Sequence, residues 1–244
     1  MTARTAFVTG GGGGIGAAVC RALAATGARV VVADLNADHA GSVAAEVDGH
    51  AVQIDVTDPD SVRQAIQKAD DFAGAIDILV NCAGWEQAMP FVDTTDAFAH
   101  KILEVNLIGA TRVIRHVLPS MTERQWGRII NVASEAGRIG APRSAFYAAA
   151  KGGLVAFSKS IAAEVAKTNV TVNVVSPGPV DTPMMSESQG EYWEKVRSYL
   201  ERAIPIGRVG VPTDVAAAVA FFASDAAEYV TGQTLSISGG LTML

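Results

Sequence analysis

The sequence has 244 residues, of which 49% are hydrophobic and 18% are charged, and its formal net charge at pH 7 is −6. This composition excludes an intrinsically disordered chain, which needs low hydrophobicity and high net charge. It also argues against nucleic acid as a partner, because phosphate binding needs a basic surface. The apolar runs are shorter than the roughly 20 residues that span a bilayer, and no signal-peptide pattern opens the chain. Two cysteines, Cys20 and Cys82, make neither a disulfide framework nor a four-ligand zinc site. We therefore expect a cytoplasmic protein with no metal and no membrane partner.

Short runs of β-branched and other apolar residues alternate with alanine-rich helical stretches. Most of these runs are continuous rather than alternating, which is typical of strands covered on both faces. The pattern predicts an α/β protein with a single-domain, Rossmann-like, doubly wound fold and a seven-stranded parallel sheet with helices on both faces. The expected strands are 6–8, 30–33, 52–54, 76–80, 128–132, 170–175 and 235–237.

The helical stretches have recognisable ends. Asp58 and Pro59 are residue types preferred at the N-cap and at the first helical position. Gly27 suits the position just after a helix ends. Further helices are expected over 96–118, ended by Pro119, and over 145–167 and 213–223.

The segment 177–212 departs from this alternation. It is rich in proline and carries the large apolar residues Met184, Met185, Tyr192 and Trp193. Long excursions in a compact domain are usually functional. We therefore expect one dinucleotide-binding and catalytic domain over 1–244, with a substrate lid at about 182–210.

A glycine-rich segment, Thr9–Gly16, lies between the first strand and the first helix. Glycines permit a tight turn and a close approach of the backbone to a pyrophosphate, and the helix N-terminus supplies free N–H groups and a positive dipole end. The position between strand and helix strengthens a signal that is weak alone. The residues expected to hold the pyrophosphate are Gly10, Gly14, Ile15 and Gly16.

Asp34 ends the second predicted strand, 18 residues after Gly16. A carboxylate there accepts hydrogen bonds from the ribose hydroxyls of NAD and repels the extra phosphate of NADP. No Arg or Lys lies between Ala33 and Glu46 to compensate, so the sequence predicts NAD as the cofactor. The alternative is that Asp34 is the N-cap of the helix that follows.

Two more segments end strands at the same edge of the sheet. Asp55-Val56 follows the third strand, where adenine lies in this fold, and Asn81–Gly84 follows the fourth. Open α/β sheets bind ligands at the carboxyl ends of their strands. We therefore expect cofactor contacts from Asp55, Val56, Asn81, Ala83 and Gly84.

Tyr147 and Lys151 are four residues apart, so on a helix they share one face. A free tyrosine has a pKa of about 10, and a neighbouring ammonium favours the phenolate and lowers that pKa. The pair is suited to moving a proton on and off an alcohol oxygen near neutral pH. Ser134 ends the fifth strand, and its hydroxyl is placed to bond the same oxygen. Alone, the pair is also compatible with a solvated helix face.

Together these motifs resemble the short-chain dehydrogenase/reductase family over essentially the whole chain. The resemblance implies a homotetramer or a dimer. By this resemblance Tyr147 is the general acid/base, Lys151 lowers its pKa and binds the nicotinamide ribose, and Ser134 orients the substrate oxygen. Asn106 would anchor a water in a proton relay that ends at Lys151, although a mid-helix Asn is more often a local backbone hydrogen bonder. The family pattern adds Leu35, Pro177, Gly178, Val180 and Thr182 to the cofactor contacts and includes Tyr147 and Lys151 among them.

Within the family, three stretches resemble the 2-hydroxycyclohexanecarbonyl-coenzyme A dehydrogenases, and the chain also resembles 3-oxoacyl-thioester reductases. These stretches are 84–86, 151–159 and 238–243. The residues expected at the substrate are Trp85 and Glu86, then Met184 and Met185 from the lid, and Arg138 and Arg143 for an anionic tail. The alternatives are packing of the lid onto the body or a subunit contact for the methionines, and solvated surface positions for the arginines.

The sequence thus predicts an NAD-dependent oxidoreductase that interconverts a secondary alcohol and a ketone, on a cyclic or 3-hydroxyacyl substrate such as a coenzyme A thioester. One alternative is an NADP-dependent 3-oxoacyl-acyl-carrier-protein reductase. A second is a non-catalytic dinucleotide-binding protein.

Overall fold

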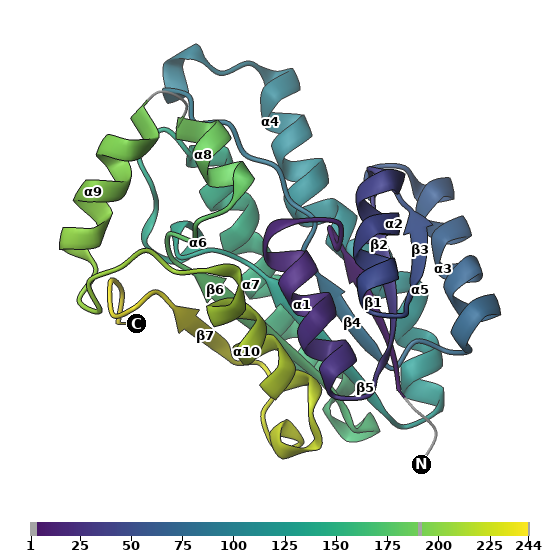
Figure 1. Cartoon of the computed structure of the whole chain (residues 1–244). Helices are drawn as coiled ribbons and strands as arrows, with labels where there is room; N and C mark the ends of the chain where they lie inside the picture. The colour runs from purple at the N-terminus through teal and green to yellow at the C-terminus, as the bar shows by residue number, and fades with distance from the viewer. Residues whose placement is uncertain (1–3, 190–191, 244) are drawn as a thin grey trace.

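The computed structural model describes residues 4–189 and 192–243. Its centre is one parallel sheet of seven strands in the order β3-β2-β1-β4-β5-β6-β7 (Figure 1). The order in which strands are added reverses between β1 and β4, because β2 and β3 lie on one side of β1 and β4 to β7 lie on the other. Open α/β sheets bind ligands at such a switch point. The strands are β1 Thr5–Thr9, β2 Arg29–Asp34, β3 His50–Gln53, β4 Ile78–Asn81, β5 Gly127–Val132, β6 Val170–Pro177 and β7 Thr234–Ile237.

Helices cover both faces of the sheet, and each face has its own apolar core. Residues of α1, α2 and α10 pack on one face, and residues of α3, α5 and α7 pack on the other. Neighbouring strand residues alternate between the cores, as Ala6 and Phe7 do, which explains the continuous apolar runs in the sequence. The helices named so far are α1 Gly14–Ala25, α2 Ala37–Glu46, α3 Pro59–Ala73, α5 Gly109–Glu123, α7 Ala145–Val165 and α10 Pro212–Ala223.

The helix signals in the sequence are confirmed where they rest on capping chemistry. The Asp58 side chain accepts a hydrogen bond from the Asp60 N–H, and Pro59 opens α3. Gly27 follows α1 with a φ of 86°, a left-handed conformation that glycine adopts without strain.

The long helix expected over 96–118 differs from the prediction in two ways. It is divided into α4 (Asp96–Leu103), one π-helical turn (Glu104–Ile108) and α5. Its expected end at Pro119 is wrong, because α5 continues to Glu123. Proline costs one backbone hydrogen bond inside a helix, but burial of Val117 and Met121 on the sheet supports the last turn.

The segment after β6 contains two helices, α8 (Pro183–Gln189) and α9 (Trp193–Ala203). They lie with α4 at the upper side of the molecule as drawn in Figure 1. None of the helices in the described part of the chain is long and apolar enough to cross a membrane.

Candidate active site

Ser134, Tyr147 and Lys151 converge beyond the carboxyl end of β5. Ser134 follows this strand, while Tyr147 and Lys151 lie one helical turn apart at the start of α7. Ser134 hydrogen-bonds the Tyr147 side chain, and the Lys151 Nζ lies 5.6 Å from the centre of the tyrosine ring. The Lys151 Nζ donates to the Val132 carbonyl at 2.9 Å, which ties the ammonium to the end of β5. The three side chains therefore come together as the sequence predicts.

Two glycines allow this close approach. The short helix α6 (Ala136–Ile139) follows Ser134 and packs on α7. A Cβ on Gly137 would lie 2.6 Å from the Gly152 backbone nitrogen and 2.9 Å from the Lys151 Cβ. Any larger residue at 137 would thus push the Ser134 loop away from the helix that carries Tyr147 and Lys151.

Burial dominates the protonation of the two titratable groups. It raises the pKa of the Tyr147 phenol above its ordinary value, the nearby Glu86 carboxylate raises it further, and the hydrogen bond with Ser134 lowers it. Burial lowers the pKa of Lys151 to about 8. The effect of Lys151 on the pKa of Tyr147 stays a prediction, because the net upward shift reflects the larger cost of burying a phenolate, and the Lys151 Nζ donates to the Val132 carbonyl.

Asn106 lies in the π-helical turn and fixes the loop after β4. Its Nδ2 donates to the Trp85 carbonyl at 2.7 Å and to the Ile102 carbonyl at 3.0 Å, and its Oδ1 accepts from the Trp85 N–H at 3.2 Å. A Cβ on Gly84 would lie 3.0 Å from Asn106 Oδ1 and 3.6 Å from Lys151 Nζ. Asn106 thus bonds the local backbone and also borders the space beside Lys151.

The glycine-rich loop and the end of β2 are joined by a hydrogen bond. The Asp34 Oδ2 accepts from the Gly12 N–H at 2.9 Å, and a Cβ on Gly12 would collide with this carboxylate. The helix-cap alternative for Asp34 is wrong, because Asn36 is the N-cap of α2 and accepts from the Asp38 and His39 N–H groups. Asp34 therefore places a negative charge directly on the loop.

The same loop lies close to Thr182, in the segment that follows β6. Gly14 has a φ of 51°, and a Cβ on it would lie 3.5 Å from the Thr182 methyl group. Thr9, at the end of β1, accepts from the Cys82 and Ala83 N–H groups at 3.1 and 3.2 Å. These contacts gather the ends of β1, β4 and β6 around one space.

The remaining cofactor candidates lie along this edge, and several have side chains that bond within the protein. Asp55 Oδ1 accepts from the Thr57 N–H and hydroxyl. The Asn81 side-chain amide donates to the Asn131 Oδ1 at 2.9 Å inside the sheet, so this side chain is engaged within the protein. Leu35 is exposed, Ile15 is half-buried, and Val56 and Val180 are buried. Gly10, Ala83, Pro177 and Gly178 lie in turns, loops or strand ends at the same edge, and Gly16 lies in the first turn of α1.

These residues fit a dinucleotide. The glycine loop opens α1 without Cβ atoms over the helix N-terminus, nothing lies within 4 Å of a Cβ on Gly13, and the Asp34 carboxylate stands where a ribose would lie. A cavity of about 370 Å³ lies elsewhere, between β7 and the connection from α9 to α10, and neither Tyr147 nor Ser134 lines it. We therefore identify the site by its chemistry and not by cavity size.

The structure places the substrate candidates in different surroundings. Trp85 lies under Lys101, whose Nζ is 3.7 Å from the ring centre, and the methyl group of Met184 reaches within 4.0 Å of a Cβ built on Gly84. Arg143 is exposed on the loop before α7, and Met185 is half-buried at the start of α8. Arg138 instead pairs with the buried Glu135 at 3.2 Å.

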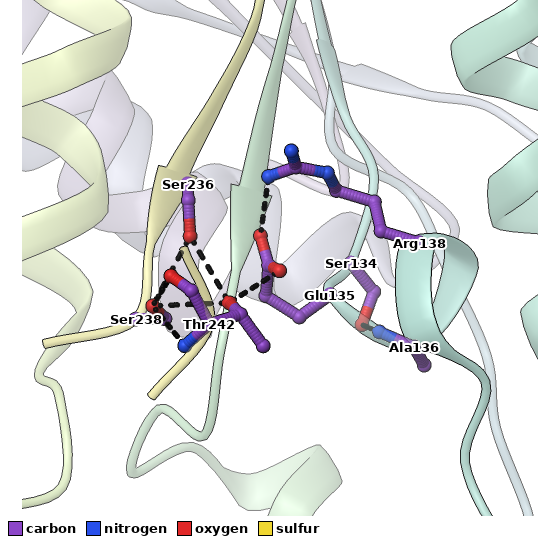
Figure 2. A network of polar contacts seen from close by, with 7 residues as sticks. All are labelled: Ser134, Glu135, Ala136, Arg138, Ser236, Ser238 and Thr242. Atoms are coloured by element: carbon purple, nitrogen blue, oxygen red, sulfur yellow. Dashed lines mark hydrogen bonds and ion pairs between the residues drawn. The ribbon is translucent and has the colours of Figure 1, made fainter. Parts of the chain in front are cut away.

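Glu135 is a functional neighbour that the sequence analysis missed. It directly follows Ser134, and its side chain points to the C-terminal segment, where Thr242 Oγ1 donates to it at 2.5 Å (Figure 2). Ser236 and Ser238 complete this network. Glu135 is the N-cap residue of α6, and its burial depends on the bond from Thr242, so the sequence near Ser134 carries no clear signal for it.

Comparison with known proteins agrees with this geometry. A family model described as enoyl-(acyl carrier protein) reductase, of the short-chain dehydrogenase type, matches residues 10–242. The chain belongs to the short-chain dehydrogenase/reductase family and is an oxidoreductase of that family, whose members bind a nicotinamide dinucleotide.

Two curated relatives and one solved structure illustrate the match. The chain is 40% identical over 247 residues to nodulation protein G of Rhizobium meliloti (strain 1021), covering 100% of this chain and 99% of that protein. It is 38% identical over 246 residues to the 3-oxoacyl-acyl-carrier-protein reductase FabG of Escherichia coli (strain K12), covering 99% and 98%. A crystal structure of a single-residue variant of actinorhodin polyketide ketoreductase with NADPH superposes with a TM-score of 0.94 at 33% identity, covering 98% of this chain and 97% of that one.

Proposed function

We propose that the protein is an NAD-dependent dehydrogenase that interconverts a secondary alcohol and a ketone on a cyclic or 3-hydroxyacyl substrate carried as a thioester. The observation that carries this proposal is the convergence of Ser134, Tyr147 and Lys151 beside the glycine loop. The proposal includes the lid at about 182–210 and a homotetramer as the assembly.

The chain's own residues supply the proton transfer. The Tyr147 phenolate accepts the hydroxyl proton of the alcohol, while the Ser134 hydroxyl bonds the same oxygen and holds it toward Tyr147. The Lys151 ammonium, fixed by Val132, adds a positive charge next to the phenol. Asn106 holds the Trp85 backbone and so shapes the wall beside Lys151. When bound, an oxidised nicotinamide supplies the hydride acceptor and a positive charge that favours the phenolate form of Tyr147.

The choice of NAD rests on Asp34. Its carboxylate bonds the glycine loop and would accept hydrogen bonds from ribose hydroxyls, while a phosphate on the 2′ oxygen would meet a like charge. The second candidate is an NADP-dependent 3-oxoacyl-acyl-carrier-protein reductase. The relatives favour it, because one is a reductase of that name and another was solved with NADPH.

The test is a spectrophotometric assay of cofactor reduction. Purified protein is mixed with NAD or NADP and with 3-hydroxybutyryl-coenzyme A, 2-hydroxycyclohexanecarbonyl-coenzyme A or simple secondary alcohols. We expect turnover with NAD on at least one thioester. Tyr147→Phe keeps the ring and removes the proton carrier, so we expect a loss of at least about 100-fold in kcat. Undiminished turnover by Tyr147→Phe would overturn the role of Tyr147. If neither NAD nor NADP is reduced with any of these alcohols or thioesters, the proposed function is overturned.

A further inference from the structure

The Glu86 carboxylate lies at the start of the helix that carries Tyr147. Ser144 is the N-cap residue of α7, but its hydroxyl makes no capping bond within the helix and donates instead to Glu86 Oε1. The N-terminus of a long helix is the positive end of its dipole and stabilises a nearby anion. The hydrogen bond from Ser144 therefore holds the Glu86 side chain in one place at the start of α7.

This carboxylate belongs to the space where the reaction takes place. Glu86 is two residues after Gly84, which borders Asn106 and Lys151. It acts electrostatically on both Tyr147 and Lys151, raising the pKa of each. The proton-transfer chemistry above does not use it, so it is a charge in the site without an assigned role.

Glu86 lies beside a shallow and largely apolar pocket, because its partner Ser144 lines that pocket. Tyr147 lines it too, with the apolar residues Met89, Phe91, Phe98, Ile102 and Phe146, and its polar lining residues include Gln87, Thr94 and Arg143. Lys101 adds a second positive side chain nearby, with its Nζ over the ring of Trp85. A carboxylate held by Ser144 and two positive side chains therefore border this part of the candidate site.

We propose that Glu86 is a specificity-determining residue that rejects substrates with a free carboxylate next to the carbinol carbon and so selects acyl groups that are neutral there, as in an ester or thioester. This inference rests on the proposed function and decides between the free hydroxy acid and its thioester. In a 3-hydroxy acid the carboxyl carbon is two bonds, about 2.5 Å, from the carbinol carbon. When the carbinol oxygen bonds Tyr147 and Ser134, a free carboxylate thus lies in the same small space as Glu86 and is repelled.

A thioester avoids this repulsion, and its distant phosphates can use the positive charge of Arg143. Its acyl carbonyl is neutral, and the phosphates of a coenzyme A or carrier-protein arm lie many bonds away, outside the apolar pocket. Arg143 lines the pocket and is exposed, so its guanidinium can pair with such phosphates. The Glu86 carboxylate and the Arg143 guanidinium together therefore fit one substrate class, an acyl group with its anionic part at a distance.

The experiment compares substrates that differ only in this charge. The pairs are 3-hydroxybutyrate with methyl 3-hydroxybutyrate, and 2-hydroxycyclohexanecarboxylate with its methyl ester. For the wild-type protein we expect kcat/KM to favour each ester over its acid by about tenfold or more. Glu86→Gln keeps the size of the side chain and its bond with Ser144, and we expect it to reduce the preference about tenfold by raising kcat/KM for the acids.

Two control variants separate charge from structure. Ser144→Ala removes the hydrogen bond and keeps the carboxylate, so the preference for esters should remain. Glu123→Gln makes the same change in net charge at the exposed far end of α5, and it should change nothing. Thermal unfolding and quenching of tryptophan fluorescence by the cofactor show whether each variant is folded and binds.

The outcomes are distinct. Equal kcat/KM of the wild-type protein for acids and esters, or an unchanged preference in a folded Glu86→Gln, overturns the role of Glu86 while leaving an active dehydrogenase. If instead neither acids, esters nor the thioesters above are turned over, the proposed function fails first. If Ser144→Ala loses the preference for esters as fully as Glu86→Gln does, the effect comes from the position of the loop. That result overturns the charge argument.

Discussion

Replacing Asp34 by Asn tests the assignment of the cofactor. The Asp34 carboxylate accepts from the Gly12 N–H at 2.9 Å, so its position is fixed against the loop that would hold the pyrophosphate. Asn keeps an oxygen that can accept this bond and removes the negative charge. Any change in cofactor preference thus reports on electrostatics more than on loop structure.

The magnitude follows from Coulomb's law. A 2′-phosphate placed at about 5 Å from the carboxylate meets a repulsion of about 1.7–3.3 kcal/mol per unit charge at an effective dielectric constant of about 20–40. Asp34 is partly exposed, so screening by water and salt reduces this value. About 2 kcal/mol remains as a working figure, which corresponds to a factor of about 30 in kcat/KM.

The assay is steady-state kinetics with NAD and NADP on one substrate at low and at high salt. We expect the wild-type protein to prefer NAD by about 30-fold, mainly through KM, and Asp34→Asn to lose most of that preference. Higher salt should narrow the difference. A tenfold or greater preference of the wild-type protein for NADP would refute the reasoning, and so would an unchanged preference in the folded Asp34→Asn variant.

Three further changes have expected outcomes. Lys151→Met removes a buried amine whose pKa is lowered to about 8. Above that pH the unfolded chain binds more protons at Lys151 than the folded chain, so the free energy of unfolding of the wild-type protein should rise relative to that of the variant between pH 8 and 9.5, by up to about 2 kcal/mol in urea unfolding. Parallel curves of stability against pH would contradict this. The Asn131 amide donates to the Ser158 hydroxyl at 2.8 Å inside the protein, and Ser158→Ala removes that partner. The free energy of unfolding should fall by about 1–3 kcal/mol. An unchanged midpoint of urea unfolding would refute this prediction. Asn106→Ala frees the Trp85 backbone; kcat/KM should fall at least about tenfold while a circular dichroism melt still shows a cooperative transition, and full activity would remove Asn106 from the site.

The fold was predictable because its signals are local and additive. Apolar runs such as 30–33 report burial on both faces, and the caps at Asp58 and Gly27 report chemistry between near neighbours. The end of α5 was not predictable from the sequence, because Pro119 is a local signal for a helix end. Packing of Met121 on the sheet overrides that signal. The π-helical turn around Asn106 likewise depends on bonds to Trp85, 21 residues away.

The site was predictable to the same extent. The spacing of Tyr147 and Lys151 follows from helix geometry, and the strand ends bring Ser134 and the glycine loop to one edge. The direction of the Tyr147 pKa shift was not predictable, since it depends on burial that a sequence does not reveal. The partner of Arg138 was equally hidden, because Glu135 is three residues away but turned toward the C-terminal segment.

Ser134 and Glu135 are neighbours whose side chains serve opposite sides of the strand end (Figure 2). One peptide unit therefore links the hydroxyl that bonds Tyr147 to the loop formed by the residues after β7. Loosening that loop would release the serine from one side, even though Thr242 lies more than a hundred positions from it in the chain. The residues after β7 are in this sense part of the frame that positions the Ser134 hydroxyl.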